Sequence, residues 1–221
     1  MKEIDLFSSS VHRTVDERVN KIEQANLEPK DFLDFEQYGY DYFDNDEFGV
    51  GYGGYHYDGR YKGAVDAFVS LFNLKQGDSI LEVGCAKGFV LYEFYKRGFE
   101  VTGVDASSYA IEQAPLEIRK RIQFNNTSKL PFPDLKFDMV LAKEVLPHLE
   151  ENNALNLISE CMRVSREGNV FLEIQCAEDA GGQKMMTTWD PTHKTTKPKA
   201  WWVHELTRLG FSGAYNCKKL F

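Results

Sequence analysis

The chain has 221 residues, of which 43% are hydrophobic, and a formal net charge of −8. This fits one large α/β domain with an N-terminal extension, and an acidic chain without a stripe of Lys and Arg disfavours duplex nucleic acid as the main partner. The N-terminus lacks the basic and apolar regions of a signal peptide, no apolar run approaches ~18 residues, and the four cysteines form no C-x-x-C pair, so we expect a cytoplasmic protein without a membrane span, a disulfide or a metal site.

The first 63 residues differ in pattern from the rest. Residues 8–26 place valines and an isoleucine at helical spacing, which predicts a surface helix. Residues 31–63 have no clean period, and seven of the eleven tyrosines lie there among glycines, which predicts loops and short turns. Two interpretations stay open for this segment. It is either an aromatic cover on the domain, or a lid whose tyrosine hydroxyls, Tyr55 among them, point with His56 and Arg60 into a cleft.

Residues 64–221 alternate between helical and strand patterns and read as a second unit. The near-continuous apolar strands predict a Rossmann-like, doubly wound, mostly parallel sheet. Residues 177–199 predict a long structureless connection with a small basic group, a candidate substrate loop. The expected helices cover residues 64–72, 89–97, 107–120, 152–165 and 200–209, and the expected strands cover 79–83, 100–105, 121–126, 137–142 and 169–176, with a closing strand within 210–221.

The first strand ends in a glycine-bounded turn. Glu82 closes an apolar run, and Gly84 and Gly88 enclose a loop of small residues before the next helix. Glycines let backbone N–H groups approach a ligand, and the following helix offers its positive N-terminus. The loop has no third glycine, so it differs from the dinucleotide G-x-G-x-x-G pattern and disfavours a pyrophosphate cofactor.

Two further polar positions follow the next strands. Asp105 lies 23 residues after Glu82 and ends the second strand, where a carboxylate can accept both hydroxyls of a ribose. A lone acid at this place is more often a helix cap, but the preceding glycine loop favours the ribose. The Asn125-Asn126-Thr127 turn follows the third strand. Open α/β sheets bind ligands at this edge, so the three features should meet.

Four sequence segments in this order carry a family resemblance. They are Ile80-Leu81-Glu82-Val83-Gly84-Cys85-Ala86-Lys87-Gly88, Val101-Thr102-Gly103-Val104-Asp105-Ala106-Ser107, Leu130-Pro131-Phe132-Pro133-Asp134 with Phe137-Asp138-Met139-Val140, and Glu144-Val145-Leu146-Pro147-His148-Leu149. Over about residues 64–176 the chain resembles a class I S-adenosylmethionine-dependent methyltransferase. The Gly51–Arg60 segment further resembles bacterial methyltransferases of sugar and surface-polysaccharide pathways.

The resemblance implies S-adenosylmethionine as cofactor and a role for each matching residue. Glu82 would orient the loop near the methionine amino group, Asp105 would hold the ribose diol, and Ala106 would pack on the adenine. Asn126 stands where the family usually has an acid for the adenine amino group. Ala86 stands where glycine is frequent, and its methyl group fits if φ is negative. The residues predicted to hold the cofactor are Glu82, Gly84, Cys85, Gly88, Asp105, Ala106, Asn126, Thr127 and Tyr55.

The resemblance also implies methyl transfer, to an oxygen or as a less favoured alternative a nitrogen, of a small polar metabolite. A base near an acceptor hydroxyl would help, and His148, His56 and His193 are the candidates, with Glu144 comparable. Examples of such an acceptor are a nucleotide-linked sugar, a glycan precursor or a phosphorylated intermediate, bound by a monomer or homodimer. Two alternatives stay open: a protein or nucleic-acid methyltransferase, and a non-catalytic cofactor-binding regulator.

Overall fold

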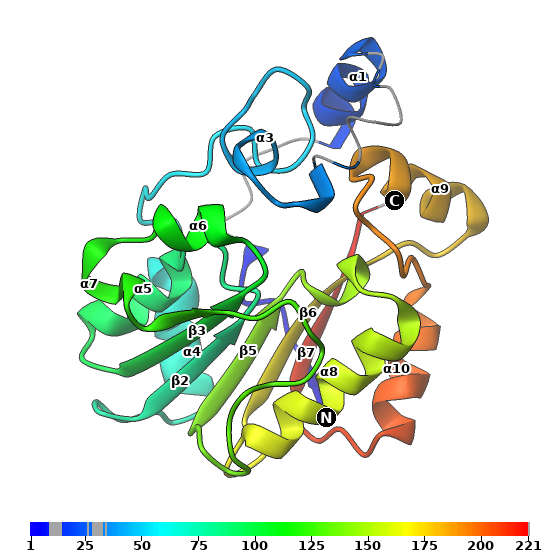
Figure 1. Cartoon of the computed structure of the whole chain (residues 1–221). Helices are drawn as coiled ribbons and strands as arrows, with labels where there is room; N and C mark the ends of the chain where they lie inside the picture. The colour runs from blue at the N-terminus through cyan, green and yellow to red at the C-terminus, as the bar shows by residue number, and fades with distance from the viewer. Residues whose placement is uncertain (9–14, 26, 28–32, 34, 221) are drawn as a thin grey trace.

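A seven-stranded, entirely parallel sheet forms the centre of the protein in the computed structural model, which describes residues 1–8, 15–25, 27, 33 and 35–220 (Figure 1). The strand order is β1-β7-β6-β5-β2-β3-β4. The chain begins with the edge strand β1, enters the middle of the sheet at β2, runs outward through β3 to β4, and then crosses to β5 and runs outward through β6 to β7. The strands are β1 Lys2–Glu3, β2 Ser79–Val83, β3 Glu100–Asp105, β4 Ile122–Phe124, β5 Met139–Lys143, β6 Val170–Cys176 and β7 Ala214–Lys219.

Helices cover both faces of this sheet, which confirms the predicted doubly wound α/β fold. One face packs against α4 (Lys62–Leu71) and α5 (Phe89–Lys96), and the other packs against α8 (Glu151–Val164) and α10 (Lys199–Arg208). Side chains on a strand alternate between faces, and both faces are buried, so the strands are nearly continuous apolar runs. Leu141 and Phe171 pack toward α4, whereas Val140 and Leu172 pack toward α8.

Three sequence expectations need correction. Residues 107–120 form two short helices, α6 (Ser108–Glu112) and α7 (Leu116–Arg119), because Pro115 between them has no N–H to donate. Residues 177–199 are not structureless: α9 (Ala180–Trp189) starts there, with Asp179 capping it by accepting from the N–H of Gly182 at 2.8 Å. Two glycines in the first turn of α9 lower the helix propensity, so the sequence pattern did not predict this helix. Strand β1, which pairs with β7, was also not anticipated.

The N-terminal segment lies beyond the carboxyl ends of the strands. Helices α1 (Val15–Ala25) and α3 (Tyr40–Phe43) lie there together with α9 (Figure 1). Residues 9–14 of the predicted N-terminal helix are outside the described residues. None of the helices in the described part of the chain has both the length and the apolar character needed to span a bilayer.

Candidate active site

Two adjoining cavities lie at the carboxyl edge of the sheet. The first, of about 150 Å³, borders the Gly84–Ala86 loop, and the second, of about 330 Å³, lies over β5, β6 and β7. We call the residues that line both cavities the shared wall. They are Tyr42, Tyr52, Lys143, Glu144 and His148.

The loop between β2 and α5 shapes the first cavity by close backbone packing. Gly84 has φ +67°, and a Cβ added there would lie 2.1 Å from Cγ2 of Val145, so only glycine fits. Gly88 has φ +72° and caps the N-terminus of α5. Ala86 has φ +50°, so the condition under which its methyl group would fit without strain is not met. An alanine in this left-handed conformation costs roughly 1–2 kcal/mol.

Asp105 is oriented by the backbone at the edge of the first cavity. Its Oδ2 accepts from the N–H of Ala86 at 2.6 Å and its Oδ1 accepts from the N–H of Ser107 at 2.8 Å. Each oxygen keeps a lone pair, which suits the two hydroxyls of a ribose. Ser107, not Asp105, caps α6, since its side chain accepts from the N–H of Ala110. Burial raises the pKa of Asp105 against the effect of these N–H groups.

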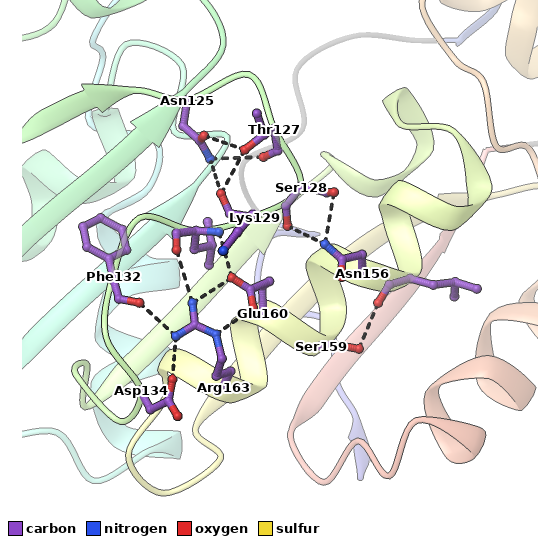
Figure 2. A network of polar contacts seen from close by, with 12 residues as sticks. Asn125, Thr127, Ser128, Lys129, Phe132, Asp134, Asn156, Ser159, Glu160 and Arg163 are labelled. Atoms are coloured by element: carbon purple, nitrogen blue, oxygen red, sulfur yellow. Dashed lines mark hydrogen bonds and ion pairs between the residues drawn. The ribbon is translucent and has the colours of Figure 1, made fainter.

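Hydrogen bonds hold the turn after β4, which also lines the first cavity. Figure 2 shows Asn125 and Thr127 bonded to each other and to the carbonyl of Lys129. Farther along the loop, Arg163 of α8 donates to the carbonyls of Leu130 and Phe132. This leaves Asn126, which is exposed and lines the first cavity, as the amide available to a ligand.

The predicted cofactor residues divide between the lining of the first cavity and the layer beneath it. Glu82, Cys85 and Tyr55 are buried without lining either cavity. The hydroxyl of Tyr55 lies 3.2 Å from that of Tyr61, within the aromatic cover. Gly88 lines neither cavity and is the N-cap of α5. The lining residues that the sequence had identified are Gly84, Asp105, Ala106, Asn126 and Thr127.

The three candidate histidines lie in different environments. His148, in the 3₁₀ turn η2 (Leu146–His148), belongs to the shared wall. His193 is buried behind it, with the ring centroids 4.6 Å apart, and burial lowers its pKa to about 4. His56 is exposed on a loop and lines neither cavity. The structure therefore brings His148 and His193 together and separates His56 from them.

The floor of the second cavity is a polar area on one face of the sheet. Toward the amino ends this face carries Leu141 and Phe171, and toward the carboxyl ends it carries Lys143, Glu173 and Gln175. Burying polar groups is costly unless they are hydrogen-bonded or paired, so the change from apolar to polar side chains along this face indicates a function. The alternation within β6, Val-Phe-Leu-Glu-Ile-Gln-Cys, is the sequence signal that could have identified it.

Glu173 is the buried acid of this floor. It is fully buried, its two carboxylate oxygens have no hydrogen-bond partner among the described residues, and the nearest ammonium, Lys143 Nζ, is 3.7 Å away. Burial raises the pKa of Glu173 to about 7. Glu144 next to it differs: burial raises its pKa, but Lys143 at 2.6 Å and Lys218 at 2.7 Å outweigh burial and hold it well below the usual range.

Aromatic residues that the sequence analysis did not single out cover both cavities. Tyr38, Tyr42, Phe43 and Tyr52 line the first cavity. The density of tyrosines in residues 38–61 indicated the segment but not which rings face inward, because that depends on where the loop docks on the sheet. Both earlier interpretations hold in part, since Tyr55 is a packing residue and Tyr52 lines the cavities.

The residues present fit S-adenosylmethionine. Asp105 and Asn126, which line the first cavity at the ends of neighbouring strands, offer acceptors for ribose hydroxyls and an adenine amino group. Glu82 Oε2 is buried without a hydrogen-bond partner among the described residues, and burial raises the pKa of this carboxyl to about 8. Such an unpaired acid beside the loop suits the methionine amino group or a water that binds it.

Comparisons with known proteins agree with this geometry. The methyltransferase domain family matches residues 81–172. An uncharacterized methyltransferase of Schizosaccharomyces pombe is 36% identical over 109 residues, covering 43% of this chain and 38% of that protein. A ubiquinone biosynthesis O-methyltransferase of Rhodopseudomonas palustris is 29% identical over 104 residues, covering 45% of this chain and 40% of that protein.

The fold is shared with solved structures. A SAM-dependent methyltransferase from Archaeoglobus fulgidus superposes with a TM-score of 0.55 at 22% identity, covering 68% of this chain and 67% of that one. The chain spans about two fifths of the length of the curated relatives it matches. The matched segments include the glycine loop and Asp105. Residues 81–172 therefore form a methyltransferase domain with the class I fold, and these comparisons support S-adenosylmethionine as its cofactor.

Proposed function

We propose that this protein transfers a methyl group from S-adenosylmethionine to an oxygen of a small polar metabolite, with a nitrogen acceptor as the less favoured alternative. The observation that carries the proposal is the shared wall. It separates a cavity suited to the cofactor from a larger cavity with a polar floor, and it contains His148. A methyl donor and an acceptor placed on the two sides would meet at this wall.

In this proposal the protein positions the reactants and excludes water, and the reactivity comes from the cofactor. S-adenosylmethionine supplies an electrophilic methyl group when it is bound. Asp105 would hold the ribose and Asn126 the adenine amino group. Tyr42 and Tyr52 of the shared wall would limit the access of water to the reacting atoms.

The second cavity favours a small acceptor with several hydroxyl groups and an anionic group. Glu173 and Gln175 on its floor can accept hydrogen bonds from hydroxyls. Arg60 and Lys218 line the same cavity and suit a phosphate or carboxylate. A nucleotide-linked sugar, a glycan precursor such as those of surface polysaccharides, or a phosphorylated intermediate has this chemistry.

His148 is the residue we propose as general base for an alcohol acceptor. Its pKa is lowered, first by burial, so the imidazole is neutral and able to take a proton at pH 7. The four cysteines are buried and free, which is compatible with a reducing compartment such as the cytoplasm. The oligomeric form we propose is a monomer or homodimer.

Two experiments test the proposal in sequence. Isothermal titration calorimetry with S-adenosylmethionine and with S-adenosylhomocysteine should show binding of both, and failure of both to bind would refute it. Transfer of a radiolabelled methyl group to a panel of sugar nucleotides and sugar phosphates should then give a methylated product. Binding without transfer across the panel would favour the non-catalytic regulator, and labelling of protein or nucleic acid instead would favour a macromolecular acceptor.

A further inference from the structure

A chain of hydrogen bonds connects His148 with the segment after α9. Nδ1 of His148 lies 2.8 Å from Oγ1 of Thr192, and that hydroxyl lies 2.7 Å from Oδ1 of Asp190. The other carboxylate oxygen of Asp190 accepts from Arg18 at 3.1 Å and from the hydroxyl of Tyr42 at 3.0 Å. All of these groups lie at the second cavity or directly behind it.

The proton positions in this chain follow from the donors available. Asp190 contacts a guanidinium and accepts from two hydroxyls, so it is ionised and can only accept. The single hydroxyl proton of Thr192 therefore points to Asp190. Oγ1 of Thr192 is then an acceptor toward His148, and Nδ1 of the imidazole must carry the proton. In a neutral imidazole this leaves Nε2 unprotonated.

Nε2 of His148 has no hydrogen-bond partner among the described residues, and His148 lines both cavities. We propose that Thr192 and Asp190 are positioning residues that hold His148 as the Nδ1–H tautomer, so that Nε2 is the proton acceptor at the shared wall. The statement that Nε2 takes its proton from the methyl acceptor rests on the proposed function. The tautomer itself does not, and it can be measured without a methyl acceptor.

The proton balance of the step is simple. An acceptor hydroxyl would give its proton to Nε2 as its oxygen bonds to the methyl carbon. The bond between that carbon and the sulfonium sulfur would break, with the electron pair left on sulfur in a neutral thioether. His148 then carries protons on both nitrogens, with Nδ1–H still bound to Thr192. Asp190 stabilises this imidazolium through the hydroxyl of Thr192, as a buried carboxylate does for a catalytic histidine in hydrolases. The proton on Nε2 later leaves to water.

The same cluster could instead be a metal site, because ligand atoms of His148, Asp190 and His193 all lie within 4.8 Å of one another. The donor set argues for a hydrogen-bonded cluster. Asp190 already accepts four bonds, one of them from the backbone N–H of Thr192. Both ring nitrogens of His193 are also engaged, with Met186 O at 3.2 Å and Gln175 Oε1 at 2.9 Å. A cation would also have to approach beside Arg18.

Several charged and titratable groups surround the His148 ring besides the proposed chain. Burial is the largest influence and lowers the pKa of His148, Asp190 and Glu144 raise it, and Arg18 lowers it. The groups that face the ring come from α1, the α3 region, the end of β5 and the segment after α9: Arg18, Tyr38, Tyr42, Glu144, Asp190 and His193.

Long-range ¹⁵N–¹H NMR spectra of the full chain labelled with [¹⁵N]histidine test the proposal directly. At pH 8 we expect His148, assigned by the loss of its signals in His148→Gln, to be the Nδ1–H tautomer. Thr192→Val removes the hydroxyl at nearly constant shape, and we expect the tautomer to change toward Nε2–H. Thr192→Ser should restore Nδ1–H. Asp190→Asn should lower the pKa of His148, because a negative charge is lost.

A matched control is Thr195→Val, which removes another buried hydroxyl of the same segment, one that donates to Leu149 O at 2.6 Å. His148 should remain Nδ1–H in this variant. An Nε2–H tautomer in the wild-type chain refutes the proposal without any variant, and so does an unchanged tautomer in a folded Thr192→Val. Stoichiometric binding of added Zn²⁺ or Mn²⁺ that shifts both His148 and His193 would show a metal site instead.

Discussion

The backbone N–H of Ala86 donates to Oδ2 of Asp105 across 2.6 Å, joining the ends of two neighbouring strands. The N–H points to the carboxylate in the same loop in which Ala86 has φ +50°. The loop conformation that strains the backbone of Ala86 is therefore the one that orients the carboxylate of Asp105. A residue that adopts this conformation without strain should keep the hydrogen bond.

Ala86→Gly should stabilise the protein by about 0.5–1 kcal/mol. Relief of the left-handed conformation is worth roughly 1–2 kcal/mol, and the greater freedom of glycine in the unfolded chain offsets about 0.4–1 kcal/mol of it. Urea unfolding measures the difference. Ala106→Gly is the control, because Ala106 has no positive φ, and it should destabilise. A destabilising Ala86→Gly would show that φ at this residue is not left-handed.

Asp105→Ala should weaken S-adenosylmethionine binding tenfold or more, which corresponds to about 1.4 kcal/mol. Each carboxylate oxygen is already oriented by one N–H, so the loss removes two preorganised acceptors for the ribose. Calorimetry of the purified variant measures the affinity. Glu112→Ala, an exposed acid at the end of the next helix, should bind like the wild type. Equal affinity of Asp105→Ala and wild type would remove Asp105 from the ribose site.

Gly84→Ala should lower stability by about 2 kcal/mol or more and weaken cofactor binding. The new Cβ would lie 2.1 Å from Cγ2 of Val145, and φ +67° adds strain. The double variant Gly84→Ala/Val145→Ala removes the clash but not the strain, so part of the stability should return. A double-mutant cycle should give a coupling energy of about 1 kcal/mol or more. Additive effects would mean that Val145 does not limit this position.

Stability should fall with rising pH because of Glu173. Its folded pKa of about 7 lies above the ordinary value of 4.5 for a glutamate, so between these pH values the folded chain holds a proton that the unfolded chain has lost. This group therefore contributes a loss of about 1.4 kcal/mol per pH unit as pH rises through the window. Glu173→Gln should remove that contribution, as urea midpoints at pH 5, 6 and 7 would show.

Exposed Glu112→Gln is the control for the pH series and should keep the wild-type pH dependence. If Glu173→Gln keeps it as well, then Glu173 titrates near its ordinary pKa. In that case the second cavity solvates or pairs the carboxylate more effectively than the contacts among the described residues indicate.

Five of the nine residues predicted for the cofactor line the first cavity, and the strand and loop that carry most of them are local in sequence. The strand, the glycine loop and the strand-terminal Asp105 follow one another within 27 residues of sequence from Ser79 to Asp105. Ala86 shows the limit of this reasoning, since the sign of φ depends on how the loop closes. The second cavity and the residues behind it depend on contacts between distant segments. Arg18 and Asp190 are 172 positions apart, and His148 and Thr192 are 44 positions apart. No local period predicts such pairs.

The pairing of β1 with β7 places Lys2 beside Ala214, so the second cavity takes Phe7 from one end of the described chain and Leu220 from the other. The entropy of loop closure grows slowly with the length of the intervening chain, and contacts between such distant segments slow folding. The first cavity needs only residues 38–157. During synthesis on the ribosome, the cofactor cradle could therefore assemble while the last strand is still missing. We therefore expect the second cavity, which takes Lys218, Lys219 and Leu220 into its lining, to be completed only when the last strand pairs.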